Sequence, residues 1–299
     1  MTEREYLVLL YSFIPFSPVR INLLISYFKN SKNVWNASSK ELLEVGLRAS
    51  TIEKFNRYRN QINPINYFKR LKSNSVDFVT FLDKDYPQNL KNLDGAPCVL
   101  YIKGKLKKSD ENAIAIVGSR KMTNYGKEVT CKFSQELAGL GVTIVSGLAR
   151  GIDTEAHKCV LEVGGRTIAV LAGGLDNIYP PENFSLAMKI IDSGGAILSE
   201  YPLGYPSYKG NFVNRNRIIS GLSKAILVIE GEKRSGTLLT ASHAANQGRP
   251  VFAVPNAITS PTSGAPLFLI QNGAKAVTCT KDILEELNLH LKTRKNSAS

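Results

Sequence analysis

Residues 225–241 read AILVIEGEKRSGTLLTA, an apolar run followed by a polar turn and a helical pattern. The apolar run predicts a buried strand, and Gly236 and Thr237 open the helix that follows it. A helix that begins just beyond a strand directs free backbone N–H groups and the positive end of its dipole toward an anion. The stretch therefore predicts a phosphate-binding turn. It leaves open whether the phosphate belongs to a small nucleotide that is cleaved or to a nucleic-acid strand that is held.

Apolar runs of the same kind recur on both sides of this stretch, at intervals of roughly 25 to 29 residues. They are AIAIVGSR from Ala113, VTIVSG from Val142, TIAVLAGG from Thr167, AILSE from Ala196 and VFAVPN from Val251. Short strands that alternate with helical segments predict an α/β fold whose parallel sheet is covered by helices on both faces. Ligands of such sheets bind beyond the carboxyl ends of the strands, so we expect the site at that edge.

Four segments differ in their pattern. Residues 1–75 have helical periodicity and predict a small all-helical domain that resembles sterile-alpha-motif or helix-hairpin-helix modules. Its first turn, IPFSPVR, lacks the glycines that would grip DNA phosphates, so we expect a docking bundle that DNA binding does not need. Residues 76–110 are a bridging segment with two short strands that joins the main sheet, 111–290 form the core, and 291–299 are a basic, disordered tail.

Composition narrows the class of partner. The net charge of +13 and the pI near 9.5 favour a polyanion through counterion release, although general solubility is the simpler alternative. The four cysteines form no CxxC pair, so we expect no metal site and no disulfide framework, as in a cytoplasmic protein. No apolar stretch reaches the roughly 20 residues that span a bilayer, so no membrane insertion is expected.

The first strand ends in Gly118, Ser119 and Arg120 without the GxGxxG pattern of dinucleotide sites. The guanidinium of Arg120 offers a fork for a phosphate, and its alternative partner is a carboxylate such as Asp153. The second strand ends at Gly147, where a glycine permits close backbone approach. Neither His157 nor His243 has a carboxylate or cysteine at the spacing of a triad or a metal site, so no catalytic residue is predicted.

Aromatic and basic side chains alternate in the Gly- and Pro-rich run between the fourth and fifth strands. Its members are Tyr201, Tyr205, Tyr208, Lys209, Phe212, Asn214, Arg215, Asn216 and Arg217. Stacking faces beside cations on a mobile loop are typical of proteins that bind single-stranded nucleic acid with little sequence preference. The alternative is a surface loop that packs its own aromatic side chains.

The ordered motifs VGSR, NYG, VSGLARGID, AVLAGGLDNIYPPEN, LSEYPLG, FVNRNRIISGLS and VIEGEKRSGTLLTA resemble the DprA/Smf family of DNA-processing proteins. The resemblance covers residues 113 to about 277. It implies an extended Rossmann-like fold, a homodimer, binding and protection of single-stranded DNA during natural transformation, and loading of the RecA recombinase. We also expect no cofactor, no metal and no enzymatic activity. The DNA-binding and phosphate-binding residues expected are Gly118, Ser119, Arg120, Gly147, Lys209, Phe212, Arg215, Asn216, Arg217, Arg234, Ser235, Gly236 and Thr237.

An alternative is an enzyme like the Lonely Guy phosphoribohydrolases, whose PGGxGTxxE motif occupies the same kind of turn. In RSGTLLT the position of the essential glutamate is taken by Thr240. A neutral hydroxyl cannot do the work of a carboxylate at an oxocarbenium-like centre. The sequence therefore favours a protein that holds a phosphodiester backbone over one that cleaves a nucleotide.

Overall fold

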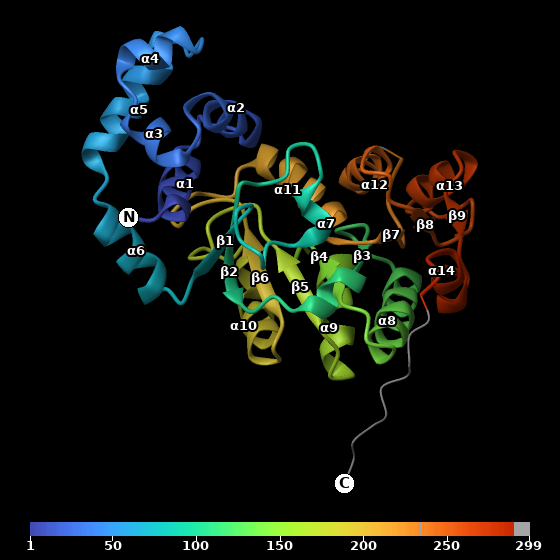
Figure 1. The fold of residues 1–299 in the computed structure, drawn as a ribbon. Coiled ribbons are helices and arrows are strands. Elements are labelled where there is room, and N and C mark those ends of the chain that lie inside the picture. The colour runs from blue at the N-terminus through green and yellow to red at the C-terminus, as the bar shows by residue number, and fades with distance from the viewer. Residues whose placement is uncertain (234, 290–299) are drawn as a thin grey trace.

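A nine-stranded sheet organises the chain, in the strand order β1-β2-β6-β5-β4-β3-β7-β8-β9. The computed structural model describes residues 1–233 and 235–289 (Figure 1). The strands are β1 Asp77–Thr80, β2 Val99–Gly104, β3 Ile114–Val117, β4 Ile144–Ser146, β5 Thr167–Val170, β6 Ala196–Ser199, β7 Ala225–Val228, β8 Val251–Ala253 and β9 Lys275–Ala276. All six apolar runs of the predicted core form strands, and the α/β class is confirmed.

The strands from β3 to β9 pair in parallel, whereas β2 runs antiparallel to β6 and β1 antiparallel to β2. The parallel strands are buried throughout β3 to β7, because helices cover both of their faces. The antiparallel pair extends the sheet with the bridging segment, as its two apolar runs predict.

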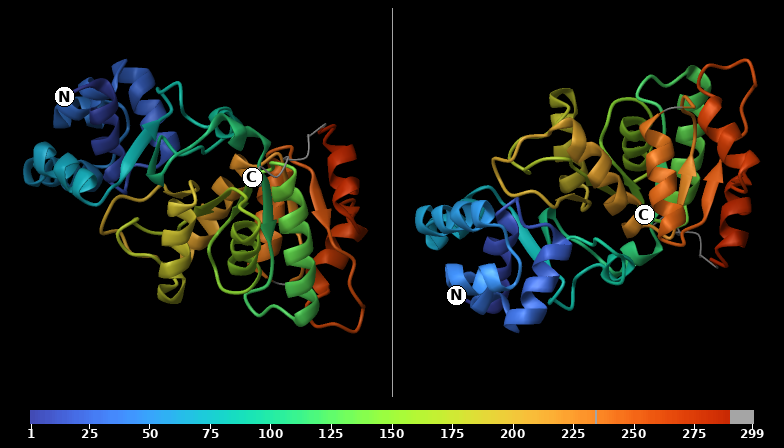
Figure 2. Two further views of the ribbon diagram at one scale, coloured as in Figure 1. Left: turned by 90° about the horizontal axis from the view of Figure 1, so that it is seen from below. Right: turned by 90° about the horizontal axis from the view of Figure 1, so that it is seen from above.

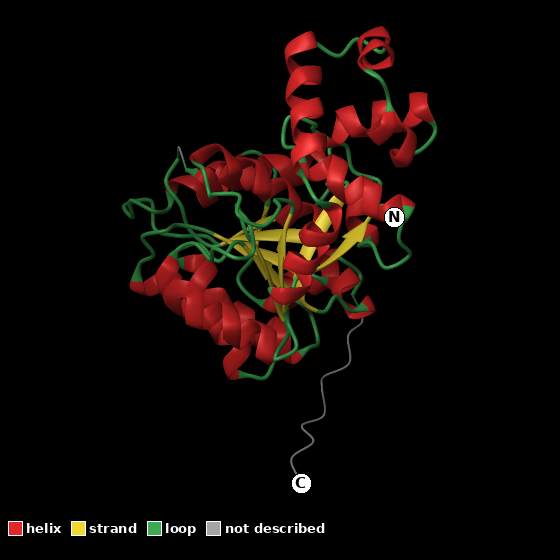
Figure 3. Ribbon diagram, turned by 90° about the vertical axis from the view of Figure 1, so that its left-hand side faces the viewer, coloured by secondary structure: helices red, strands yellow, loops and turns green. Residues whose placement is uncertain are grey.

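The crossover helices divide between the two faces of the sheet (Figures 1 and 3). One face carries α8 Asn124–Gly139, α9 Ile152–Glu162 and α10 Phe184–Asp192. The other carries α11 Lys209–Leu222 and α12 Gly236–Asn246, together with the short α7 Gln88–Lys91. Beyond β8 lie α13 Gly264–Gln271 and α14 Thr280–Glu286, and two 3-10 turns span Lys108–Asn112 and Pro181–Asn183. From β3 to β6 each new strand is added on one side of the sheet, and β7 is then added on the other side of β3. The topological switch point therefore lies between β3 and β7.

Six helices precede the sheet and form a lobe at its β1 end (Figure 2). They are α1 Glu3–Ser12, α2 Pro18–Phe28, α3 Ser31–Asn36, α4 Ser39–Glu44, α5 Ala49–Gln61 and α6 Pro64–Ser73. The hydrophobic core of this lobe is continuous with that of the sheet, since Leu10 and Phe55 belong to the same buried cluster as Tyr101 and Ile197. The lobe is therefore packed onto the sheet and is not an appended module. Among the helices of the described residues, none combines the length and apolar character that crossing a bilayer requires.

A disulfide joins α8 to α9 between Cys131 and Cys159, whose Cα atoms are 5.2 Å apart. The expectation of no disulfide is therefore wrong for this pair, whereas Cys98 and Cys279 are free. The two cysteines are 28 residues apart, so no local spacing motif indicates them; they meet because consecutive crossover helices pack side by side.

We expect reduction to lower the free energy of unfolding by about 3–4 kcal/mol, because a cross-link across a loop of this length restricts the unfolded chain. Urea unfolding with and without a phosphine reductant measures the difference. The Cys131→Ser variant should unfold at the midpoint of the reduced protein and no longer respond to reductant. Equal midpoints for the oxidised and reduced wild type would contradict the cross-link.

Candidate nucleic-acid interface

A cavity of about 760 Å³ opens at the carboxyl edge of the sheet, at the switch point between β3 and β7. Segments far apart in the sequence line it: the turn after β3, the first half of α11, and the turn and first turns of α12 after β7. Ala149, Asp153, Tyr179 and Ser207 complete the lining. The site thus lies where the sequence predicts a ligand, beyond strands that end next to each other.

The amino terminus of α12 faces this cavity and is suited to bind an anion. Ser235 is its N-cap residue, and no side chain of the described residues caps the helix. The Ser235 hydroxyl is buried and has no hydrogen-bond partner among those residues. Both Gly236 and Thr237 line the cavity. Uncapped N–H groups at the positive end of a helix dipole are a ready site for a phosphate oxygen.

Cations complete the polar lining. Arg120, Lys121 and Lys209 line the cavity and are exposed or nearly so. Arg120 forms no ion pair with any carboxylate in the part of the chain that the structure describes, so the alternative partner Asp153 is not used. A guanidinium without a carboxylate at the mouth of a cavity is available to an external anion.

An aromatic ring lies beside these cations. The ring of Phe212 has the guanidinium of Arg120 over its face at 5.3 Å, and the ring of Tyr179 contacts it edge-on at 5.6 Å. A partly exposed aromatic face next to a cation suits a stacked base whose phosphate meets the cation. Tyr205 instead stacks on Tyr201 at 5.1 Å, which is the alternative that the sequence left open for the loop tyrosines.

The basic run of residues 209–217 is helical and not a mobile loop, since α11 begins at Lys209. Its Arg215 is only 3% exposed, and its guanidinium donates to the carbonyl of Gly147 at 2.6 Å and to that of Val170. Burial lowers the pKa of Arg215 to about 10, which still leaves it charged at neutral pH. Burial also raises the pKa of the Asp153 carboxyl, an effect that nearby Arg215 opposes. Arg215 therefore holds the strand ends together, although one part of it borders the cavity.

Arg217, by contrast, does not line the cavity, although the sequence analysis placed it in the phosphate-binding set. It lies on the opposite side of α11 and pairs with Glu200, with 2.6 Å between Nη2 and Oε2. A helix turns about 100° per residue, so residues 215 and 217 point in nearly opposite directions.

The other predicted residues divide as follows. Ten line the cavity: Gly118, Ser119, Arg120, Lys209, Phe212, Arg215, Asn216, Ser235, Gly236 and Thr237. Gly147 does not line the cavity. A Cβ atom at this position would lie 2.5 Å from Nη1 of Arg215, so the glycine leaves room for that guanidinium. Arg234 lies outside the described residues, as does the predicted tail at 291–299.

Glu230, which the sequence analysis did not identify as a functional residue, organises the same edge of the sheet. Its carboxylate is fully buried and accepts from the backbone N–H and hydroxyl of Thr123, both at 2.8 Å, and from the hydroxyl of Thr262 at 3.0 Å. These contacts join the end of β7 to the start of α8 and to the loop before α13. A buried acid directly after a strand is a signal that could have found it, but its partners are 107 and 32 residues away.

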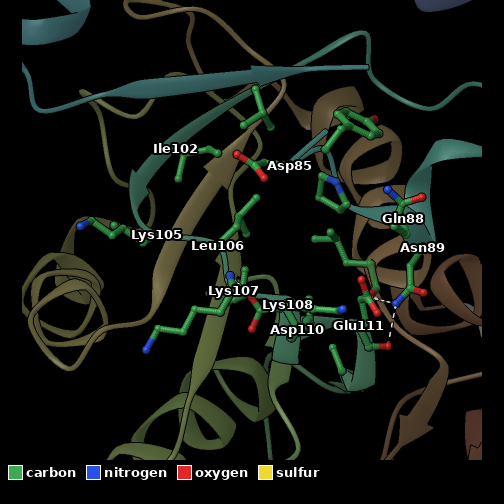
Figure 4. A pocket seen from close by; sticks show the side chains of 18 of the residues that line it. Asp85, Gln88, Asn89, Ile102, Lys105, Leu106, Lys107, Lys108, Asp110 and Glu111 are labelled. Carbon is green, nitrogen blue, oxygen red and sulfur yellow. Dashed lines mark hydrogen bonds between the residues drawn. The ribbon is translucent and has the colours of Figure 1, made fainter. Parts of the chain in front are cut away.

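A second cavity, of about 550 Å³, lies at the amino ends of the strands (Figure 4). Its apolar floor includes Val145 and Ile168. Its charged lining is balanced: Lys84, Lys105, Lys107 and Lys108 against Asp77, Asp85, Asp110 and Glu111. Because none of the predicted site residues reaches it and its charges offset one another, it does not compete with the first cavity as a polyanion site.

Comparison with known proteins gives consistent matches. The family model described as DNA recombination-mediator protein A matches residues 77–288. Protein Smf of Synechocystis is 42% identical over 275 residues, which cover 90% of this chain and 69% of Smf. The crystal structure of DNA processing protein A from Streptococcus pneumoniae aligns with a TM-score of 0.83 at 34% identity, covering 97% of this chain and 99% of that one. The Helicobacter pylori protein, described for its single-stranded DNA binding mode, aligns with a TM-score of 0.64 at 29% identity over 73% of this chain and 97% of its own.

The two arginines of the cavity should behave differently when replaced. Arg215→Met should lower the free energy of unfolding by about 3–5 kcal/mol, since it leaves buried carbonyls and the Asp153 carboxylate without their cation. Arg120→Ala, at an exposed position, should change it by less than about 0.5 kcal/mol. Urea unfolding at neutral pH measures both. Equal stability of the two variants would show that Arg215 is not the structural cation described here.

Proposed function

This chain belongs to the DNA recombination-mediator protein A family, and from that premise we propose that its switch-point cavity holds the phosphate backbone of single-stranded DNA. The observation that carries the proposal is the uncapped amino terminus of α12, which faces the same cavity as the unpaired Arg120. A backbone site and a cation that line the same cavity can hold neighbouring phosphates without reading base identity.

The aromatic side chains support a single strand over a duplex. Phe212 and Tyr179 present rings at the cavity, and an unpaired base can stack on such a surface for roughly 1–3 kcal/mol per base. In a duplex the base faces are already stacked. The relative from Helicobacter pylori, described for its single-stranded DNA binding mode, supports the same choice.

The wider role we propose is that of the family. The protein would act in the cytoplasm as a homodimer, protect incoming single strands during natural transformation, and load the RecA recombinase onto them. Relatives named as DNA processing proteins support the DNA-related part of this role.

We propose further that the protein holds DNA without cleaving a nucleotide. Thr240 lines the cavity, and its hydroxyl donates to the carbonyl of Gly236 at 3.3 Å. No carboxylate stands at this position to stabilise a sugar cation. Release of a free base from a nucleoside monophosphate by the wild-type protein would favour the phosphoribohydrolase alternative.

The central test is a fluorescence-anisotropy titration with a labelled oligonucleotide. We expect the single strand to bind more tightly than the same sequence as a duplex, with steep salt dependence and little base preference. A duplex that displaces the single strand mole for mole would contradict this expectation.

Arg120→Ala should weaken single-strand binding on the order of tenfold, because a charge-assisted hydrogen bond is lost. It should also reduce the slope of log K against log salt by about 0.7, the value for one phosphate contact. Lys158→Ala is a matched control, as this lysine lies on α9 and does not line the cavity. An unchanged affinity for Arg120→Ala would place the DNA elsewhere.

A further inference from the structure

The two faces of helix α11 make different contacts. One face lines the cavity with Phe212, Asn216 and Ile219. The other carries Arg217, whose side chain points away from the cavity toward Glu200. Whatever holds Arg217 therefore holds the helix that forms one wall of the DNA site.

The N-terminal lobe reaches this point through Tyr11 of α1. The hydroxyl of Tyr11 donates to Oε2 of Glu200 at 2.8 Å, and this oxygen also accepts from Nη2 of Arg217 at 2.6 Å. The Tyr11 side chain is 5% exposed and Glu200 is 7% exposed. One oxygen of Glu200, which is 189 residues from Tyr11 in the chain, thus joins the first helix of the lobe to Arg217 of α11.

The polar groups of Tyr11, Glu200 and Arg217 are buried, so they depend on one another for hydrogen bonds. Burial and the adjacent Glu200 raise the pKa of Tyr11, so the hydroxyl remains a donor at neutral pH. The other carboxylate oxygen, Oε1, and Nη1 of Arg217 are buried and have no partner among the described residues. The orientation of the pair consequently depends on the contacts to Oε2, which are strong because the surroundings are of low dielectric constant.

The link continues to the phosphate-binding helix. Gln247, which follows α12, donates from Nε2 to the backbone carbonyl of Arg217 at 3.0 Å. The order of contacts is therefore α1, Glu200, α11 and the carboxyl end of α12, the helix whose amino end lines the cavity.

We propose that Tyr11, Glu200 and Arg217 are positioning residues through which the N-terminal lobe sets the placement of α11 and thereby the affinity for single-stranded DNA. The proposal rests on the proposed function. It replaces two expectations from the sequence: that Arg217 contacts a phosphate, and that DNA binding does not need the lobe.

The test uses the full chain and compares Tyr11→Phe with Tyr58→Phe. Each substitution removes one hydroxyl from the same lobe and keeps the ring. Among the described residues, the hydroxyl of Tyr58 bonds only within the lobe, to Ser12 at 2.6 Å and to the carbonyl of Leu9 at 3.3 Å. Hydrogen exchange of residues 209–222 without DNA and anisotropy titrations with a labelled single strand are the two measurements.

We expect Tyr11→Phe to accelerate exchange in α11 and to weaken binding about fivefold or more, within the usual range of coupling between sites. Tyr58→Phe should change neither, even where it lowers the melting temperature. Equal exchange and equal affinity in the two variants would overturn the proposal. If the wild type fails to bind single strands, the proposed function is wrong, and the exchange measurement alone still decides whether Tyr11 positions α11.

Arg217→Gln separates positioning from phosphate contact. A positioning residue should weaken binding while the salt slope stays that of the wild type. A slope lower by about 0.7 would mean that Arg217 itself neutralises a phosphate, and would overturn its assignment.

Discussion

The buried guanidinium of Arg215 is the interaction on which the candidate site depends. It donates to carbonyls at the ends of β4 and β5, where two parallel strands stop and their backbone acceptors face the interior. A buried carbonyl without a donor costs free energy comparable to a lost hydrogen bond, so the strand ends require this cation or water. Arg215 belongs to α11. Its hydrogen bonds to the carbonyl groups at the strand ends therefore also fix where that helix crosses the sheet.

Several acidic side chains near the site are buried, whereas most of the exposed charged groups at the cavity are cations. The carboxylates of Asp153, Glu200 and Glu230 are buried and hold loops or other side chains in place. Arg120 and Lys209 remain exposed at the cavity without an acidic partner among the described residues. The exposed carboxylate of Glu232 also lines the cavity, but the cations of Arg120, Lys121 and Lys209 outnumber it. This local positive excess matters more to a polyanion than the net charge of the whole chain.

The sequence predicted the sheet well because buried parallel strands are continuous apolar runs, which can be recognised without knowing their neighbours. The turn at Gly236 could be predicted equally well, since the end of a strand and the start of a helix are local features of the sequence. The roles of Arg215 and Arg217 were not, because a run of basic residues shows composition but not which side of a helix each residue occupies. The Cys131–Cys159 pair and the partners of Glu230 depend on contacts between distant segments, which no local pattern contains.

The core shared by the N-terminal lobe and the sheet has a consequence for biosynthesis. The six helices of the lobe are made first, yet their buried cluster includes Tyr101, Ala169, Ile197 and Leu203. At a translation rate of about 5–20 residues per second, the ribosome needs roughly 6 to 25 s to add the residues between the lobe and Leu203. During that interval the nascent helices expose apolar surface that only later strands can cover. The earliest part of the chain to be synthesised is therefore among the last to complete its packing, and it is the part most in need of a chaperone while translation continues.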